Sequence, residues 1–367
     1  MWFKRMPLEE WFDKYQYEIE YDVGESAVKY LSFGELNVDL ANLPLRYGHH
    51  CGRPDLRKLI SDQYDGLNPE NIMVTTGASE ANFCVVAALA KPGDHVIVEH
   101  PNYPSLYEVP RSLGCKVSLF SLKYENRFKP DLNELKKMIT PETKLISLTH
   151  PNNPSGSIIS KETLDQVVQL AEEHNVYVLF DETYRELAFE EILPSAASLS
   201  PKMISISSMS KCYGLPGIRT GWMASQTDEI IDSVLAVREQ LSITNGAVSE
   251  EIAFNVLQRK HEFLQRAKDH VRKNLDHVVS WMKQQKDITW VPPEAGVVAL
   301  PRIETGEIDD PETVYRILAE KYRSFVVPGR CFEMDNTYFR IGFGGTADEL
   351  QTGLINIVKA INDVKNG

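Results

Sequence analysis

The chain has 367 residues, of which 43% are hydrophobic and 25% charged, and its formal net charge is −13. This size suffices for a large core and predicts two domains, or one large and one small. The acidic balance argues against nucleic acid as a partner. The longest apolar stretch, residues 83–90, is too short to span a bilayer, so we expect no membrane association.

The N-terminus and the cysteines bear on the compartment. The first ten residues lack the apolar centre of a signal peptide, and we therefore expect a cytoplasmic protein. The five cysteines are scattered and form no Cys-x-x-Cys pair, which predicts neither a disulfide framework nor a zinc site. His49 and His50 have no third ligand nearby in the sequence, so we expect no metal site.

The middle of the chain alternates short β-branched runs with amphipathic segments. Five runs predict buried strands, at 71–76, 95–100, 144–150, 176–180 and 203–208. Helices are predicted between them, near 79–91, 104–114, 131–140 and 160–174. This alternation predicts an α/β fold with a mostly parallel sheet and helices on both of its faces.

The last third of the chain follows a different pattern. It is nearly all helical from Thr227 to about 287, and a mixed region follows. That region has strand-like runs at 288–300, 324–328 and 338–344, a helix start at Asp310-Pro311, and a last helix from Ala347. We expect a large domain over 40–255 and a smaller α/β domain made of 1–39 and 256–367.

Unusual polar clusters come directly after the predicted strands, where open α/β sheets bind ligands. Gly77, Ala78 and Ser79 open a helix after the first strand, so their N–H groups suit a phosphate. An ordinary helix start is the alternative. Tyr103 follows the second strand and suits stacking on a flat heteroaromatic ring, with a packed loop tyrosine as the alternative.

The next two strands end in an amide and a carboxylate. Asn153 lies in the turn 151–156 and suits a ring substituent or a substrate carboxylate, unless it only shapes the turn. Asp181 ends a buried strand, where a carboxylate needs a partner. A protonated pyridine nitrogen is a fitting one, and a helix cap is the alternative. Tyr184 follows within reach of the phenolic oxygen of such a ring.

Lys211 lies in the most informative run of the chain, 205–222, together with Ser208, Ser210 and Arg219. A lysine that forms a Schiff base must lose its proton, and a nearby positive charge favours that loss. Hydroxyls and a guanidinium also suit a phosphate dianion. Pyridoxal 5'-phosphate (PLP) is an aldehyde that carries a phosphate, and it meets both requirements. A surface lysine in a serine-rich loop is the alternative.

Arg340 lies inside the apolar run 338–343. Its planar fork suits the α-carboxylate of a substrate. An internal salt bridge is the alternative.

In this order, the motifs resemble the class I/II aminotransferase family of PLP-dependent enzymes, fold type I. The resemblance runs over residues 43–345 and rests on Tyr47-Gly, Gly52 to Leu56-Arg57, Thr-Gly-Ala-Ser, Pro-Asn-Tyr-Pro, Asn-Asn-Pro-Ser-Gly, Asp-Glu-Thr-Tyr, Ser-x-Ser-Lys with Gly-Ile-Arg, and Arg340. It implies a large domain with a mostly parallel sheet and a smaller α/β domain. It also implies that Lys211 forms an aldimine and moves the Cα proton of an L-amino acid, most simply in amino-group transfer to a 2-oxo acid.

The resemblance implies a role for each matched residue. Asp181 pairs with the pyridinium nitrogen, Tyr184 and Asn153 bind the ring oxygen, and Tyr103 stacks on the ring. The phosphate is held by the Gly77 turn with Ala78, Ser79, Ser208, Ser210 and Arg219. Arg340 binds the substrate carboxylate. Tyr47 resembles the tyrosine that such enzymes lend to the neighbouring subunit, which implies a homodimer with shared active sites.

The N-terminal block departs from common members of the family. The segments 7–12 and 24–36 are more similar to the capreomycidine-synthase branch, whose members cyclise hydroxylated arginine. This implies PLP-dependent elimination and cyclisation as the alternative to transfer. Glu9, Glu25 and Glu35 are then candidate partners of a guanidinium, unless they are solvated surface charges. A PLP-binding regulator is disfavoured, because the residues before the motifs hold no basic helix-turn-helix pattern.

Overall fold

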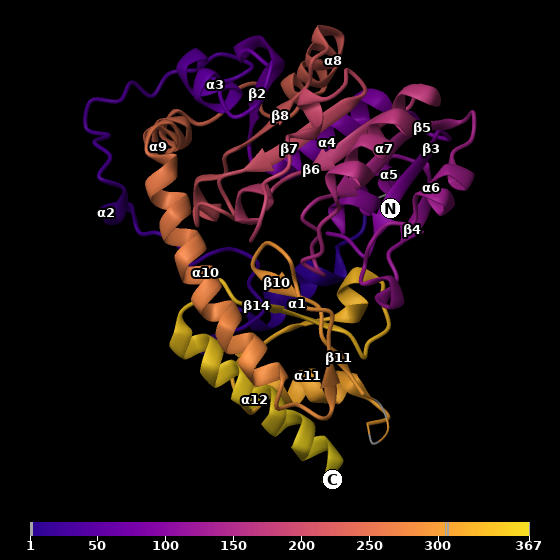
Figure 1. The fold of residues 1–367 in the computed structure, drawn as a ribbon. Helices are drawn as coiled ribbons and strands as arrows, with labels where there is room; N and C mark the ends of the chain where they lie inside the picture. Colours follow the sequence, from indigo (N-terminus) through magenta and orange to yellow (C-terminus); the bar gives the residue numbers. More distant parts are fainter. Residues whose placement is uncertain (1–2, 305, 307, 367) are drawn as a thin grey trace.

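A seven-stranded sheet forms the centre of the computed structural model, which describes residues 3–304, 306 and 308–366 (Figure 1). Its strands, in spatial order, are β2 (Ile72–Thr75), β8 (Gly221–Ala224), β7 (Met203–Ser208), β6 (Tyr177–Asp181), β5 (Thr143–Thr149), β3 (His95–His100) and β4 (Lys116–Ser121). From β7 to β4 all neighbours are parallel, whereas β8 runs antiparallel to β2 and β7. The predicted α/β fold with a mostly parallel sheet is confirmed.

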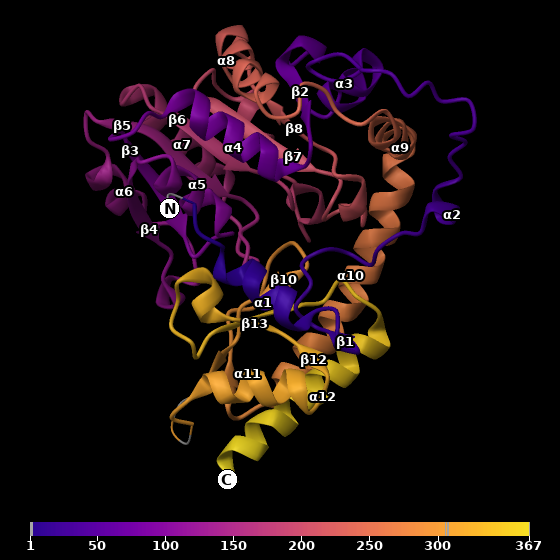
Figure 2. The same ribbon diagram turned by 180° about the vertical axis from the view of Figure 1, so that it is seen from behind.

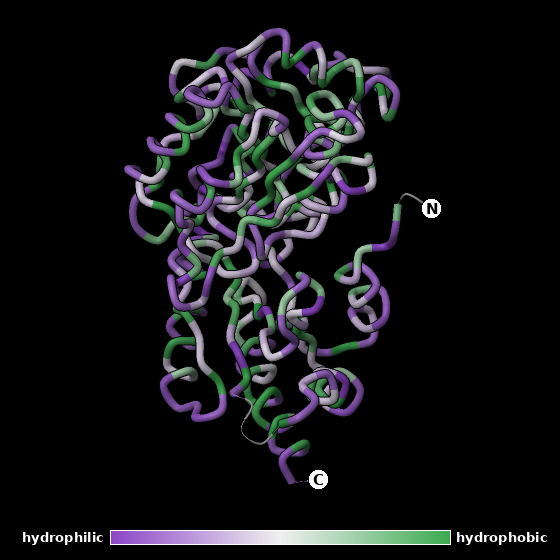
Figure 3. The backbone as a smooth tube through the Cα atoms, turned by 90° about the vertical axis from the view of Figure 1, so that its right-hand side faces the viewer, coloured by the Kyte–Doolittle hydropathy of each residue, from purple (hydrophilic) through white to green (hydrophobic). Residues whose placement is uncertain are grey.

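Helices cover both faces of the sheet because its strands are apolar on both sides. In β3, Val96 and Val98 pack on one face and Ile97 on the other. The first face is covered by α4 (Ala78–Leu89), α5 (Ser105–Ser112) and α8 (Asp228–Glu239). The second is covered by α6 (Leu132–Met138) and α7 (Lys161–Glu173). Figure 3 shows the hydrophobic segments mostly inside this layered arrangement.

The rest of the chain builds a second, smaller region below the sheet, reached through a long helix (Figure 1). Its helices are α10 (Lys260–Met282), α11 (Pro311–Glu320) and α12 (Ala347–Lys365). Its strands are β10 (Val298–Ala299), β14 (Phe339–Gly342) and β13 (Val327–Pro328) in one antiparallel sheet, β9 (Ile288–Thr289) with β11 (Arg302–Ile303), and β1 (Tyr21–Asp22) with β12 (Ser324–Phe325). The helix α1 (Pro7–Tyr15) lies between this region and the sheet (Figure 2).

Further elements connect these regions. They are α2 (Phe33–Leu36), α3 (Pro54–Ser61) and α9 (Ala247–Gln258), and the 3-10 helices Pro69–Asn71, Tyr124–Asn126, Arg185–Leu187, Ala196–Ser198, Pro216–Ile218 and Gly329–Phe332. In the described residues, no helix has the length and apolar character that a membrane span needs.

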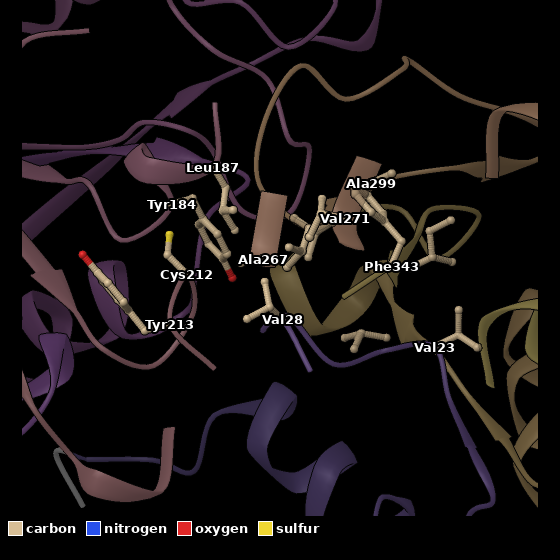
Figure 4. Close-up of a cluster of buried hydrophobic side chains, with 14 of the residues drawn as sticks. Val23, Val28, Tyr184, Leu187, Cys212, Tyr213, Ala267, Val271, Ala299 and Phe343 are labelled. Carbon is tan, nitrogen blue, oxygen red and sulfur yellow. The ribbon is translucent and has the colours of Figure 1, made fainter. Parts of the chain in front are cut away.

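An apolar cluster joins the N-terminal segment to both regions. Figure 4 shows Val28 in one cluster with Tyr184, which follows β6, and Ala267 of α10. Val23 lies further along the same cluster, near Phe343. Because these side chains come from distant parts of the sequence, burying them holds the segment 22–28 in the middle of the molecule.

The five predicted strands correspond to β2, β3, β5, β6 and β7, and the sequence analysis missed β4 and β8. The domain limits 40–255 and 256–367 stay predictions. The limit at 255/256 falls inside α9, one turn before α10 begins.

Candidate active site

A pocket of about 320 Å³ lies at the carboxyl ends of β5, β6 and β7, and residues of α1 line it as well. It brings together most of the residues singled out from the sequence, namely Glu9, Glu25, Ala78, Ser79, Tyr103, Asn153, Asp181, Tyr184, Ser208, Ser210, Lys211, Arg219 and Arg340. The topology explains this, since parallel strands direct their carboxyl ends to one edge of the sheet.

Lys211 lies at the centre of this pocket, just after β7. Its Nζ is 2.9 Å from the Ser26 hydroxyl and 3.5 Å from Glu25 Oε1. Burial acts to raise the pKa of Glu25, but Lys211, a hydrogen bond from Tyr30 and Arg340 together lower it to about 2. Glu25 is therefore ionised and balances the positive charges around it.

Asp181 ends β6 and is partly buried. The Thr183 amide and hydroxyl both donate hydrogen bonds to its Oδ1, at 2.9 and 2.5 Å. Burial raises the pKa of Asp181, although Thr183 and Lys211 act against this. Among the described residues no ion pair to Asp181 within 4 Å is formed, so a cationic ring nitrogen suits the position.

The phosphate end of the pocket is built around Gly77, which precedes α4 with φ +79°. A Cβ atom there would lie 2.5 Å from Nη2 of Arg219. Only glycine thus lets this guanidinium lie against the start of α4. There, the N–H groups of Ala78 and Ser79 belong to the first turn of the helix, and no side chain caps it. With Ser208 beside them, these groups fit a phosphate.

Two tyrosines are oriented by hydrogen bonds that they donate to residues near the N-terminus. Tyr103 donates to Glu9 Oε1 at 2.9 Å, and Tyr184 donates to the Ser26 carbonyl at 2.7 Å. Burial raises the pKa of both phenols above the ordinary value, so both stay protonated donors.

Arg340 lies on β14 and is only 1% exposed. Its Nη1 donates to Asn153 Oδ1 at 3.1 Å, and its Nη2 donates to the Gly24 carbonyl at 2.7 Å. Its Nε is buried and has no hydrogen-bond partner among the described residues. A buried guanidinium with an unused donor fits a carboxylate ligand.

Three predicted residues are not among those that line the pocket: Gly77, which borders its phosphate end, and Glu35 and Tyr47, which lie away from it. Glu35 accepts from Ser32 in the capping box of α2 and from Arg266 at 2.8 Å, and these contacts lower its pKa to about 2. Its assignment as a substrate ligand of its own subunit is therefore corrected: its carboxylate is already used in a helix cap. Tyr47 is 83% exposed, and its role stays a prediction.

Among the pocket residues that the sequence analysis did not single out are Asp13, Ser26 and Thr183. Asp13 follows Glu9 by one helical turn. If residues 7–15 are taken as a helix, this spacing predicts that both carboxylates lie on the same face. Ser26 has no local signal, because only the packing of segment 22–28 brings it to Lys211.

The profile of the family Aminotransferase class I and II matches residues 36–357. The chain belongs to this family. Capreomycidine synthase of Streptomyces vinaceus is 29% identical, covering 98% of this chain and 95% of that enzyme. An aspartate aminotransferase of Pyrococcus horikoshii is 28% identical over 87% of this chain and 84% of its own.

Solved structures of family members agree in fold over the whole chain. A PLP-dependent aminotransferase from Streptococcus suis has a TM-score of 0.93 at 31% identity, with 99% of both chains covered. The PLP-dependent cyclase OrfR has a TM-score of 0.90 at 27% identity, with 98% of this chain and 97% of its own covered. The protein is an enzyme of this family with PLP as its cofactor and an amino acid as its substrate.

Proposed function

We propose that this enzyme transfers the amino group of an L-amino acid with a cationic side chain to a 2-oxo acid. One observation carries this proposal. The base of the pocket holds the cations Lys211, Arg219 and Arg340, whereas the wall formed by the N-terminal segment is acidic. The base suits a phosphate and an α-carboxylate, and the acidic wall suits a positive side chain.

The residues at the base of the pocket have separate roles in the proposed reaction. Bound PLP withdraws electrons from the substrate and thereby weakens its Cα–H bond. In this proposal Lys211 takes up and returns the proton at Cα, and Asp181 keeps the ring nitrogen protonated. Arg219 and the start of α4 hold the phosphate, while Arg340 orients the substrate carboxylate.

The acidic wall is formed by Glu9 and Asp13 of α1 together with Glu25. Glu9 and Asp13 are four residues apart and therefore share one face of the helix. Asp13 pairs with the exposed Arg5, a surface contact that a buried ligand can replace at small cost. Asp13 is thus available to a guanidinium or ammonium group in the pocket, and Glu9, which accepts from Tyr103 through Oε1, lies one helical turn away.

A second candidate is the cyclisation of a hydroxylated arginine to a cyclic guanidino amino acid. The similarity to capreomycidine synthase covers 98% of this chain and so includes most of the N-terminal segment, which lies before the family match at 36–357. Both candidates need the same residues for proton removal. They differ in the next step, which is either loss of the amino group or loss of a leaving group from the side chain.

Product analysis separates the two candidates. The pure enzyme is incubated with PLP, a 2-oxo acid and a panel of amino acids that includes arginine, hydroxylated arginines, aspartate and phenylalanine. Oxo-acid formation from arginine supports transfer, and a product lighter by one water supports cyclisation. A clear preference for aspartate or phenylalanine contradicts the cationic substrate.

The role of the acidic wall is tested by Glu9→Gln and Asp13→Asn, with Glu35→Gln as the matched control outside the pocket. Losing one charge-assisted contact should weaken arginine binding by about 1.5–3 kcal/mol. The control should bind arginine like the wild type. Binding is measured by titration of the cofactor absorption.

We also propose that the active enzyme is a cytoplasmic homodimer with shared sites. Large apolar side chains are exposed on the segments around Tyr47 and beyond α8, among them Leu45, Leu241 and Ile243. A second copy of the chain is the partner that would cover them. The acidic composition and the five free cysteines favour a reducing compartment.

A further inference from the structure

The N-terminal segment 22–28 passes through the centre of the pocket, although it lies before the family match at 36–357. It contacts several residues at the base of the pocket. The carbonyl of Gly24 accepts from Arg340 at 2.7 Å. Ser26, which is only 5% exposed, contacts Lys211 through its hydroxyl and Tyr184 through its carbonyl.

The backbone of this segment is held firmly, which determines where Ser26 lies. Asp22 Oδ1 accepts from the amides of Gly24 and Glu25, both at 2.8 Å. The Val28 amide donates to the carbonyl of Lys211 at 3.1 Å. A Cβ at Gly342 would lie 1.8 Å from the Glu25 carbonyl oxygen, so β14 approaches the segment as closely as a glycine allows.

We propose that Ser26 is a positioning residue that holds the Lys211 amine in place throughout the reaction, a role that rests on the proposed function of Lys211. A hydroxyl both donates and accepts, so it can accept from the ammonium and donate to the neutral amine. The neighbouring Glu25 carboxylate can only accept. The Ser26 hydroxyl can therefore form a hydrogen bond with Lys211 both when the lysine is protonated and when it is neutral.

The carbonyl of the same residue orients Tyr184, so Ser26 links two side chains of the base. A side-chain substitution leaves this carbonyl in place. The variant Ser26→Ala thus removes only the contact with Lys211. Its matched control is Ser198→Ala, because the Ser198 hydroxyl is also buried but finds no hydrogen-bond partner in the part of the chain that the structure describes.

The first measurement uses the protein without cofactor. PLP is added, and the visible band that reports its capture by the lysine is followed with time. We expect Ser26→Ala to reach the same final occupancy but about ten- to a hundredfold more slowly, as expected for the loss of a hydrogen bond to a charged group. Ser198→Ala should capture PLP at the wild-type rate.

The second measurement is steady-state turnover with the best amino acid of the panel. Ser26→Ala should lower kcat by a similar factor with little change in KM, and Ser26→Thr, which restores a hydroxyl, should recover part of the loss. A wild-type capture rate in Ser26→Ala, or equal changes in kcat and KM with a lowered melting temperature, would overturn the proposal. Capture of PLP in a borohydride-reducible form by Lys211→Ala would instead overturn the proposed function itself.

Discussion

Asp181, which is partly buried, and Glu99, which is buried, are both carboxyl groups near the carboxyl ends of strands, but their surroundings differ. Asp181 lines the pocket and lies near Lys211. Glu99 is 3% exposed and accepts from the Thr149 amide at 2.9 Å and from the Asn152 side chain at 3.3 Å. The first suits a charged ligand, and the second stiffens the loops that carry Asn153 and Tyr103.

Asp181→Asn should preserve the fold and the cofactor content but slow the removal of the Cα proton. An amide cannot balance a protonated ring nitrogen, and losing such an interaction costs on the order of 2–4 kcal/mol, or roughly 30- to 1,000-fold in rate. Exchange of the Cα hydrogen of the substrate in deuterated water measures this step directly. A variant that exchanges as fast as the wild type would show that Asp181 only caps the turn at Thr183.

Glu99→Gln should change how stability depends on pH. Burial raises the pKa of Glu99 to about 7, above its ordinary 4.5, so the native state binds the proton more tightly than the unfolded state does. The stability from this group is complete below pH 4.5 and is lost as the pH rises through 7. Relative to the variant, the wild type should therefore lose about 3 kcal/mol between pH 5 and pH 8.

Urea unfolding at several pH values measures this difference. The surface variant Glu191→Gln serves as the control and should follow the wild type at every pH. Parallel curves for wild type and Glu99→Gln would mean that Glu99 does not titrate in this range.

At the scale of elements, the start of α4 shows how a strand–helix junction makes a binding site. The turn needs φ +79° and ψ 167° at Gly77, a conformation that other residues rarely adopt. The same residue leaves the space that Arg219 fills. The backbone N–H groups and the guanidinium therefore converge on one point.

Gly77→Ala should weaken PLP binding about ten- to a hundredfold, because the added Cβ displaces Arg219 and removes a charge-assisted contact. Gly93→Ala is a matched control: Gly93 has a similar φ of +92°, but a Cβ there meets open space. Fluorescence titration with PLP compares the two. If both variants bind PLP with equal affinity, the Cβ added at Gly77 alters only the backbone strain and not the contact of Arg219.

At the scale of the whole molecule, one described chain supplies the base and the acidic wall but leaves Tyr47 far out in solvent. The proposed dimer gives this side chain a place at the phosphate end of the partner's pocket. Such an arrangement couples activity to assembly.

Mixing Lys211→Ala with Tyr47→Phe chains should restore activity. If Tyr47 serves the opposite subunit, each mixed dimer has one site with both changes and one with neither. The mixture should then approach about a quarter of wild-type activity, because random pairing makes about half of the dimers mixed. No gain after confirmed subunit exchange would place Tyr47 in its own subunit's site or outside any site.

Sequence patterns alone located the strands that organise the sheet, because β3, β5, β6 and β7 are buried runs rich in β-branched residues. They did not locate β4, whose exposed and half-buried residues follow its place at the edge of the sheet, or the short β8, which is defined by its pairing with β2 and β7. Pairing with strands that are distant in the sequence gives the four residues of β8 no local sequence pattern that predicts a strand.

For the site, the sequence by itself determined the residues at the strand ends, from Gly77 to Arg219. A parallel sheet brings such residues together whatever the details of packing. Only the tertiary structure determined where the side chains of the N-terminal residues lie. It placed Ser26 on Lys211 and Asp13 in the acidic wall, and it turned Glu35 away to Arg266. These positions depend on long-range contacts with β14 and α10, and such contacts follow from packing rather than from any local pattern of residues.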